Sequence, residues 1–243
     1  MGKIFVVGIG PGEEQSMTLR ARQVLSECDL IVGYKAYIDL IKHIYPDKEF
    51  VESAMKQEID RCEACIKYAN EGKKVALICS GDSGIYGMAS PLLETAQRLG
   101  FYDVEVVAGV TAASAGAAVL GAPINHDFCV ISLSDLLTPW ELIEKRLICA
   151  ARGDFCIVIY NPSSHKRADY LEKACNIMLT ELSAKTICGY VRNIGRDKTE
   201  YEVCTLGELV TKQVDMFTTV FIGNSQTRIV NGKMVTPRGY KDS

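Results

Sequence analysis

Residues 3–12 read Lys3-Ile4-Phe5-Val6-Val7-Gly8-Ile9-Gly10-Pro11-Gly12, an apolar run that passes directly into a glycine-rich loop. A short apolar run that ends in glycine is typical of a buried strand in a parallel sheet. The loop glycines would let a ligand approach the backbone closely, although a tight turn alone would also need them. The residues that follow disfavour a phosphate ligand. Pro11 has no amide hydrogen, and Glu13 stands where a dinucleotide fingerprint has its third glycine.

Outward from this strand, strand-like and helix-like segments alternate along the chain, as they do in parallel βαβ units. In the first half we expect strands at 3–8, 30–33, 75–79 and 104–107, and helices at 18–27, 37–45, 57–71, 89–99 and 111–120. In the second half we expect strands at 129–133, 155–160, 186–191, 199–204 and 219–223, helices at 139–151, 167–182 and 206–210, and a hairpin at 229–235. The pattern predicts an α/β fold of two lobes, with a mostly parallel sheet in the first lobe and a mixed sheet in the second.

A proline-containing stretch, Ala122–Asp127, follows the helix stop at Gly121 and is predicted to link the two lobes. We therefore expect an N-terminal α/β domain over residues 1–121 and a C-terminal α/β domain over residues 122–243, with the active-site cleft between them. Ligands of open α/β sheets bind at the carboxyl ends of the strands. The loops in those positions are therefore the candidate binding loops.

Composition narrows the class of protein. The net charge of −3 over 243 residues gives no indication of the basic face that nucleic-acid binding requires. No apolar run approaches the ~18 residues of a membrane span, and the apolar N-terminal stretch is too short for a signal peptide. We therefore expect a cytoplasmic protein whose ten cysteines are thiols. Cys62 and Cys65 have Cys-x-x-Cys spacing, but no second pair or histidine cluster accompanies them, so we expect no metal site.

Four further loops follow predicted strands: Ser80–Gly87, Gly109–Ala115, Tyr160–Arg167 and Tyr190–Arg196. The first contains three glycines and Asp82, a residue that would also serve as a turn or cap residue only. The second is rich in small residues, which close packing of a helix on a sheet would equally require. The last two carry cations, as protein surfaces commonly do. The sequence contains no nucleophile elbow and no Walker loop. The residues alone thus predict a two-lobed α/β protein that binds a small polar ligand between its lobes.

Three motifs together resemble those of the tetrapyrrole methylases. They are Val7–Gly12, Ser80–Gly87 and Gly109–Ala113, which occur in the family's order and spacing. Each motif is weak when taken singly, whereas the ordered set is specific, and the resemblance covers nearly the whole chain. Ser83 departs from the proline or alanine that many members have after the aspartate of the second motif.

The second half resembles one branch of that family, the precorrin-3B C-17 methyltransferases and cobalt-factor III C-17 methyltransferases. The segments that carry this resemblance are His126–Phe128, Ile131–Trp140, Tyr160–Ser164 and Phe221–Ser225. The resemblance implies an S-adenosylmethionine-dependent methyltransferase of cobalamin biosynthesis. Such an enzyme methylates C-17 of precorrin-3B or cobalt-factor III and contracts the macrocycle, giving precorrin-4 or cobalt-precorrin-4.

This chemistry fits the residues. S-adenosylmethionine carries a sulfonium and no phosphate, so acidic residues beside a glycine loop are acceptable. Methyl transfer is an in-line displacement that depends on proximity and orientation and needs no covalent enzyme intermediate. The resemblance further implies that any cobalt arrives inside the substrate and that the protein is a homodimer.

The resemblance also assigns binding residues. The positions that match the family's cofactor site are Pro11, Ser80, Gly81, Asp82, Ile85, Thr111, Ala112 and Asn161. The candidates for binding the tetrapyrrole substrate are Gly10, Lys35, Arg192 and Arg196. The lysine and the two arginines are cations that can hold its carboxylate arms, arginine through two parallel hydrogen bonds.

Ring contraction requires a proton to move, so a general acid or base is expected within hydrogen-bond reach of the macrocycle. His126 is the foremost candidate, because histidine is the residue type most suited to proton transfer at neutral pH and His126 lies in the predicted linker, where Asp127 would orient it. Ser132 and Asp135 of the branch-specific segment are further candidates. Alternatively, His126 only ties the linker down by hydrogen bonds.

Two functions of other kinds remain open. A methylase of the same fold that acts on uroporphyrinogen, a diphthamide precursor or ribosomal RNA would share the glycine loops but not the Ser132–Trp140 segment. A non-catalytic ligand-binding protein would be expected to lose the loop glycines, all of which are present. The sequence also leaves open whether the tetrapyrrole is metal-free or carries cobalt.

Overall fold

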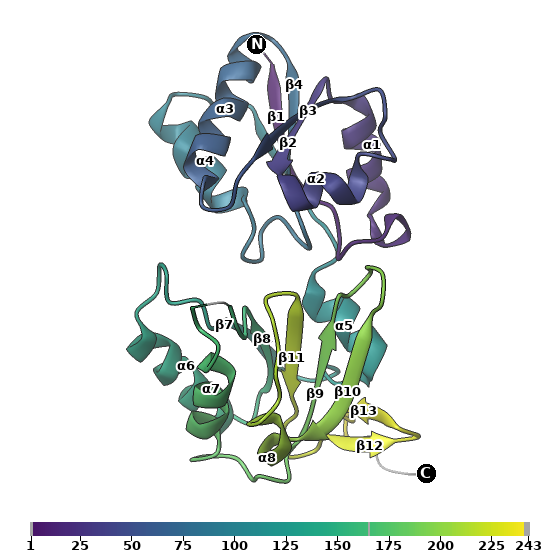
Figure 1. Cartoon of the computed structure of the whole chain (residues 1–243), viewed down its shortest axis with the longest axis vertical. Helices are drawn as coiled ribbons and strands as arrows, with labels where there is room; N and C mark the ends of the chain where they lie inside the picture. The colour runs from purple at the N-terminus through teal and green to yellow at the C-terminus, as the bar shows by residue number, and fades with distance from the viewer. Residues whose placement is uncertain (1, 165, 241–243) are drawn as a thin grey trace. The chain divides into compact units, whose positions relative to one another are not determined.

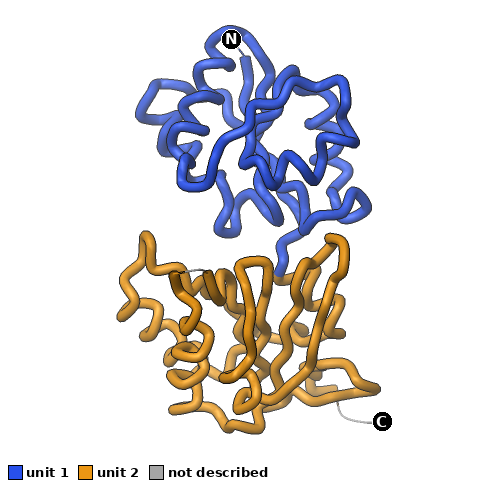
Figure 2. The backbone as a smooth tube through the Cα atoms, viewed as in Figure 1, with its two compact units in different colours: residues 1–112 blue, residues 113–243 orange. Residues whose placement is uncertain are grey.

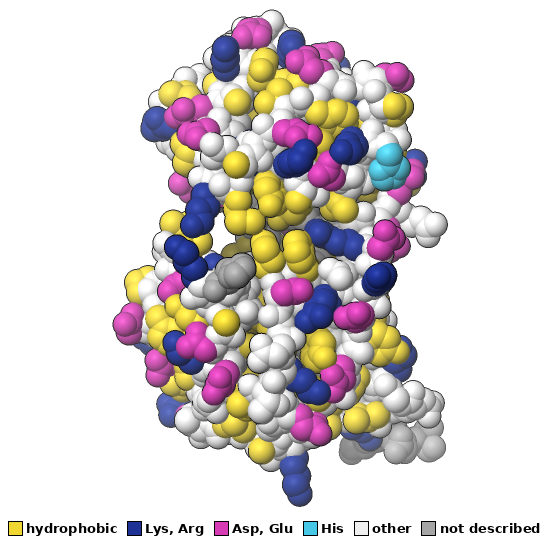
Figure 3. Space-filling model, viewed as in Figure 1, with side chains coloured by type: hydrophobic (Ala, Val, Ile, Leu, Met, Phe, Trp, Pro, Cys, Tyr) yellow, Lys and Arg dark blue, Asp and Glu magenta, His cyan; other side chains and the backbone are white. Residues whose placement is uncertain are grey.

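The computed structural model describes residues 2–164 and 166–240, and the chain divides into two compact units, Met1–Ala112 and Ala113–Ser243 (Figures 1 and 2). Both units are α/β, as predicted. None of the helices in the described part of the chain has the length and apolar character that crossing a membrane requires. On the face shown in Figure 3, acidic and basic side chains are interspersed over both units, in keeping with the small net charge.

The first unit is built on a parallel sheet with the strand order β3-β2-β4-β1-β5. Its strands are β1 (Lys3–Gly8), β2 (Leu30–Tyr34), β3 (Glu49–Ser53), β4 (Lys74–Cys79) and β5 (Val104–Val107). A short 3₁₀ turn, η1 (Glu14–Ser16), precedes the helices α1 (Leu19–Glu27), α2 (Lys35–Ile41), α3 (Glu58–Asn70) and α4 (Ala89–Arg98). The helices α1 and α2 cover one face of the sheet, and α3 and α4 cover the other (Figure 1).

Burial on both faces explains the uninterrupted apolar run of β1. Ile4 and Val6 pack into the cluster under α3 and α4, whereas Phe5 and Val7 pack into the cluster under α1 and α2. Successive strand residues point to opposite faces, so a strand covered on both sides needs apolar residues throughout.

Local residues define the helix boundaries of the first unit. Thr18 caps α1, since its side chain accepts a hydrogen bond from the Ala21 amide at 3.1 Å. Gly72 and Gly100, which follow α3 and α4, adopt positive φ angles of 94° and 71°. The sequence did not predict β3, because Glu49, Glu52 and Ser53 interrupt its apolar pattern and it lies at the edge of the sheet.

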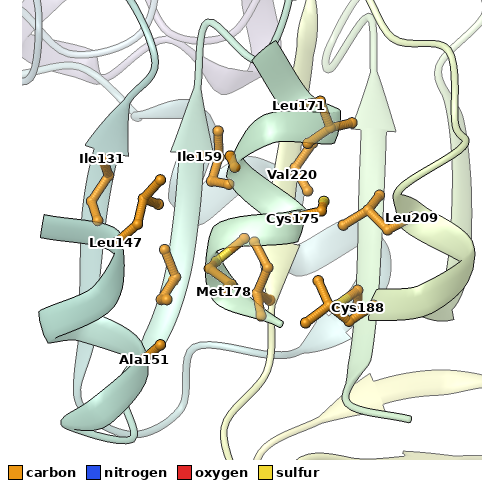
Figure 4. Packing of buried hydrophobic residues seen from close by; sticks show 14 of the residues in the cluster. Ile131, Leu147, Ala151, Ile159, Leu171, Cys175, Met178, Cys188, Leu209 and Val220 are labelled. Atoms are coloured by element: carbon orange, nitrogen blue, oxygen red, sulfur yellow. The ribbon is translucent and has the colours of Figure 1, made fainter. Parts of the chain in front are cut away.

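The second unit contains a mixed sheet with the strand order β10-β9-β11-β8-β7, as predicted. Its strands are β7 (Phe128–Ser132), β8 (Cys156–Tyr160), β9 (Ile187–Arg192), β10 (Glu200–Thr205) and β11 (Thr218–Ile222). The helices α6 (Trp140–Arg152), α7 (Tyr170–Met178) and α8 (Leu206–Leu209) cover one face of this sheet. Figure 4 shows Leu147 of α6 and Met178 of α7 among the strand side chains Ile131, Ile159 and Cys188.

The helix α5 (Ala112–Leu120) packs on the other face of the second sheet. Val220 and Ile222 of β11 point into the α6–α7 core, so Phe221 between them points the opposite way. There it meets Gly116, where an added Cβ would lie 2.8 Å from the Phe221 ring. This packing puts α5 in the second unit, and the units divide at Ala112 rather than after Gly121.

A small third sheet completes the second unit. The strands β12 (Arg228–Val230) and β13 (Lys233–Val235) form the predicted hairpin, with φ angles of 49° at Asn231 and 74° at Gly232. Strand β13 pairs with β6 (Gly121–Ala122), and the Thr236 hydroxyl donates to the Pro123 carbonyl at 2.7 Å. The segment predicted as a linker therefore lies within the second unit.

We expect Leu147→Ala to destabilise the second unit by about 2–5 kcal/mol. Leu147 lies on the buried face of α6, and truncation of its side chain leaves a cavity in the core. Trp140 is the only tryptophan of the chain and lies in α6, so its fluorescence during urea denaturation reports on this unit. Leu142→Ala on the same helix is the matched control, since Leu142 is 39% exposed, and it should cost less than about 1 kcal/mol. Equal losses for the two variants would contradict the assigned packing.

Candidate active site

The glycine loops of the first unit meet because the strands that precede them are neighbours. In the sheet β1 lies between β4 and β5, and parallel strands end at the same edge. The Ile9 amide donates to the Cys79 carbonyl at 3.0 Å. Gly10 and Gly81 form a two-way bridge, with hydrogen bonds of 3.1 Å and 2.7 Å between their backbones. The loops after β1 and β4 are thus bonded to each other directly.

Four glycines make these loop contacts possible. A Cβ at Gly109 would lie 2.2 Å from the Gly81 carbonyl oxygen, and a Cβ at Gly8 would lie 2.6 Å from the same oxygen. Gly10 and Gly81 have φ angles of 77° and 72°, a region that favours glycine. The three loops therefore pack backbone against backbone, and the glycines make this packing possible.

Asp82 is held by backbone amides. Its Oδ1 accepts from the Gly84 amide at 2.8 Å, which makes a local turn, and its Oδ2 accepts from the Gly109 amide at 2.9 Å. The turn role that the sequence left open is thus present. The second bond goes further, because it ties the loop after β4 to the loop after β5.

The other cofactor candidates of the first unit lie on the same three loops. Pro11 is buried, Ser80 and Thr111 are half-buried, and the Ile85 side chain is 39% exposed beside Tyr86. Ala112 begins α5. The structure therefore brings together at one edge all the candidates that the first unit contains. Asn161 belongs to the second unit.

Lys35 lies apart from Gly10, at a cavity of about 610 Å³ near the carboxyl ends of β2 and β3. The cavity is lined by Tyr34, Lys35, Ala36, Asp39, Glu52, Ser53, Ala54, Met55 and Gln57. The Lys35 ammonium pairs with Glu52 at 3.0 Å, and this hydrogen bond raises the pKa of the lysine. Arg61 is only 5% exposed and fixes the cavity wall by donating to the Ser53 hydroxyl at 2.6 Å and to the Ala54 carbonyl at 3.0 Å.

In the second unit the carboxyl ends of β7 and β8 bring Ser132 and Asn161 together. The two strands are parallel, with Ser132 opposite Tyr160. Asn161 has a φ of 52°, and its side-chain amide donates to the Ser132 hydroxyl at 2.9 Å. The Ser134 amide donates to the same hydroxyl at 3.2 Å. The Ser132 oxygen therefore receives two hydrogen bonds from its own unit.

Asp135 is clasped by two residues that the sequence did not single out. The Tyr170 hydroxyl donates to Oδ2 at 2.6 Å, and Arg167 Nη1 lies 3.2 Å from Oδ1. These contacts, the tyrosine first, lower the pKa of Asp135, and the same hydrogen bond raises the pKa of Tyr170. Asp135 is therefore a carboxylate at neutral pH and a weak base. Its clasp fixes the start of a loop whose Leu136 and Leu137 side chains are 62% and 98% exposed.

The two arginine candidates lie at the same edge, where Arg192 ends β9 and Arg196 follows it. Strand β9 runs parallel to β8, because each is antiparallel to β11. Arg192 is engaged within its unit by Glu200 at 3.5 Å, by Asp215 at 3.4 Å and by the Gln213 carbonyl at 3.0 Å. The Arg196 guanidinium lies 5.0 Å from the centre of the Phe217 ring.

The structure does not bring His126 to this edge. His126 precedes the amino end of β7, and the carbonyl of its neighbour Asp127 accepts from Cys156 at the amino end of β8. The four residue steps from Phe128 to Ser132 span about 13 Å at about 3.3 Å per residue. The His126 ring is half exposed, with Nδ1 3.6 Å from the Asp127 carboxylate. Within the second unit, then, His126 and Ser132 lie at opposite ends of the same strand.

The sequence missed Ser83, Arg167 and Tyr170, since their importance rests on contacts 24 to 35 residues away along the chain. The Cys62 and Cys65 side chains of α3 are fully buried in the core under α3 and α4. Burial raises the pKa of Cys62 to about 11 and that of Cys65 well above its ordinary value, so both are thiols packed as hydrophobic groups. His165 in the loop after β8 lies outside the described residues.

Comparison with known proteins gives matches over most of the chain. The family model described as Tetrapyrrole (Corrin/Porphyrin) Methylases matches residues 3–210. A probable cobalt-factor III C(17)-methyltransferase of Salmonella typhimurium is 47% identical over 239 residues, which cover 98% of this chain and 99% of that protein. A precorrin-3B C(17)-methyltransferase of Sinorhizobium sp. is 38% identical over 248 residues, with coverages of 98% and 97%. The crystal structure of the methyltransferase CobJ has a TM-score of 0.90 at 35% identity, with coverages of 98% and 100%.

The clasp on Asp135 predicts a pH-dependent contribution to stability. Its pKa in the folded state lies below the value of about 3.9 expected in the unfolded chain, so the contribution is fully present above about pH 5 and is lost as the pH falls through the folded pKa. The difference in unfolding free energy between wild type and Asp135→Asn should therefore become smaller as the pH falls from 6 to 2. It is measured by Trp140 fluorescence at intervals of about one pH unit. Tyr170→Phe should reduce this pH dependence, because it removes the largest cause of the shift. A difference that stays constant over the pH range would refute the assignment.

Proposed function

Because this chain belongs to the tetrapyrrole (corrin/porphyrin) methylase family, we propose that it methylates C-17 of cobalt-factor III and contracts the macrocycle, in cobalamin biosynthesis. The expectation of a methyltransferase that uses S-adenosylmethionine as methyl donor is confirmed at the level of the family. The choice of C-17 and of a particular macrocycle rests on the named relatives.

One observation carries the choice of substrate. The identity is 47% to the protein named for cobalt-factor III and 38% to the protein named for precorrin-3B, over nearly the full length of each. The identity supports the cobalt-bearing tetrapyrrole, with the product cobalt-precorrin-4. Metal-free precorrin-3B, which would give precorrin-4, is the second candidate. In either case cobalt would belong to the substrate.

The glycine loops of the first unit suit the donor. S-adenosylmethionine supplies a methyl group on a sulfonium and brings no phosphate. The backbones of the loops that contain Pro11, Gly81 and Thr111 converge at one sheet edge without a cluster of lysine or arginine side chains from those loops. We propose that these backbones hold the donor, and that Asn161 is a further donor-binding residue, as the resemblance implies. Holding donor and acceptor in line supplies much of the rate of a displacement.

For the proton movement of ring contraction, Ser132 is the residue we favour. A hydroxyl whose oxygen receives hydrogen bonds from Asn161 and Ser134 becomes a stronger donor toward an oxygen that gains negative charge. The clasp on Asp135 favours a role in positioning the Ser134–Pro139 segment, which follows Ser132 directly. The placement of His126 at the amino end of β7 favours its alternative role in the turn before that strand.

The substrate's carboxylate arms require cations. Lys35 at its cavity and Arg196 at the edge of the second sheet are the proposed partners, and Gly10 offers backbone next to the donor loops. Arg192 already pairs with Glu200 and Asp215. It would therefore bind a substrate carboxylate only as a third carboxylate partner.

The proposal is tested by incubating the protein with labelled S-adenosylmethionine and either cobalt-factor III or precorrin-3B, followed by mass analysis of the product. We expect transfer of one methyl group and ring contraction with cobalt-factor III, and a lower kcat/KM with precorrin-3B. Preference for precorrin-3B would move the assignment to the metal-free substrate. Transfer to uroporphyrinogen alone would place the chain in another branch of the family.

The same assay separates the candidate proton donors. Ser132→Ala should slow contraction by a factor on the order of 10² or more, as expected when a preorganised donor to a developing oxyanion is removed, while donor binding persists. His126→Ala should change contraction by less than about twofold, because His126 lies at the opposite end of β7. The reverse order of effects would restore His126 as the acid or base.

We further propose that the protein is a homodimer in the cytoplasm. The dimer is proposed by analogy with relatives of this two-lobed form. The edge strand β12 has the exposed apolar side chains Ile229 and Val230, which an interface would bury. The cytoplasm is supported by the ten free cysteines, which a reducing compartment maintains. Light scattering should give about twice the chain mass of 26.7 kDa. A single-chain mass at the concentration of the assay would remove the dimer.

A further inference from the structure

Ser83 is the anchor of the loop that follows β4. Its side chain is fully buried, and its hydroxyl donates to the carbonyl of Val107, the last residue of β5, at 2.9 Å. This bond joins the loop after β4 to a strand that is not its neighbour in the sheet, since β1 lies between β4 and β5.

The backbone of the loop closes around the same residue. The Ser83 carbonyl accepts a hydrogen bond from the Ala89 amide, at the first residue of α4, at 3.0 Å. Gly87 packs directly on this carbonyl, since a Cβ there would lie 2.5 Å from the Ser83 oxygen. The loop is thus fixed at its start, at its end and across to β5 through one residue.

Asp82 adds a second tie in the same direction. Its two carboxylate oxygens accept from the Gly84 and Gly109 amides at 2.8 Å and 2.9 Å. The side chains of Asp82 and Ser83 are therefore both bonded to backbone groups, at Gly84 and Gly109 for Asp82 and at Val107 for Ser83.

We infer that Ser83 and Asp82 are positioning residues, which lock the loop after β4 onto β5 and Gly109 so that loop backbone, rather than either side chain, meets the methyl donor. The inference rests on the proposed use of these loops for S-adenosylmethionine. Loops that are already ordered in the folded protein lose little conformational entropy when the ligand binds. The hydrogen bonds of Ser83 and Asp82 therefore contribute to affinity without touching the ligand. Loss of the Ser83 hydroxyl would leave the Val107 carbonyl without this partner in a buried place.

The test compares two ligands that differ in charge. S-adenosylmethionine is a sulfonium cation, whereas S-adenosylhomocysteine has a neutral sulfur. We expect Ser83→Ala and Asp82→Asn each to raise Kd by about tenfold, the size expected for one broken buried hydrogen bond, and to do so equally for both ligands. The KM for the donor should rise by the same factor while kcat changes by less than about threefold. Ser83→Cys, which keeps a weak donor, should lie between wild type and Ser83→Ala.

Ser90→Ala is the matched control, because Ser90 is exposed on the adjacent helix α4, where its hydroxyl donates to the Glu94 carboxylate at 2.6 Å. Its Kd should stay within twofold of wild type. Calorimetry is carried out at a temperature where circular dichroism shows each variant folded. If Ser83→Ala fails to fold, Asp82→Asn, which keeps the side-chain volume, carries the test with the same thresholds.

Two results would overturn the inference. If Asp82→Asn weakens the binding of S-adenosylmethionine alone, the carboxylate meets the sulfonium directly. Alternatively, the variants could lower the melting temperature with unchanged Kd values, which would leave the ties a role in stability alone. Wild-type protein that binds neither ligand would instead overturn the proposed function, and the inference with it.

Discussion

The backbone contact among Gly8, Gly81 and Gly109 is the constraint on which the first unit's site depends. The carbonyl oxygen of Gly81 occupies the space that a side chain on either of the other two residues would need. The contact arises because β4, β1 and β5 are adjacent and parallel, so their loops leave the sheet at one edge. Three loops that are far apart along the chain therefore form one surface made largely of backbone.

A surface of this kind favours a particular chemistry. Backbone amides and carbonyls can hold a ligand of mixed polarity without a concentration of charge, which suits a donor with a sulfonium and no phosphate. The carboxylate of Asp82 accepts hydrogen bonds from two backbone amides of these loops. Its charge thus contributes first to the geometry of the loops.

The second unit is organised by side chains. Ser132 and Asn161 bond to each other at the ends of two parallel strands, and Asp135 is held by Tyr170 and Arg167. These polar contacts lie where the segment resembles one branch of the family. The glycine motifs that resemble the whole family thus lie mainly in the first unit, whereas the segments that resemble one branch lie in the second. The same division explains why family membership follows from the glycine loops and the choice of substrate does not.

The sequence by itself determined the elements whose signals are local. Strand β1, helix α1 and the hairpin around Asn231-Gly232 were all predicted, because each depends on residues within a few positions. It also predicted the family, since the loop motifs recur in order. The edge strand β3 was missed, because partial exposure leaves it without a clear apolar pattern.

Only the tertiary structure decided what depends on strand direction and on distant contacts. His126 and Ser132 are close in sequence, yet an extended strand separates them, so one lies at the amino edge of the sheet and the other at the carboxyl edge. Helix α5 belongs to the second unit because Gly116 packs against Phe221, a contact that the local sequence does not predict. Ser83 likewise gained its importance from a carbonyl on β5. Local signals specify which elements form, whereas the pairing and direction of those elements specify which side chains can meet.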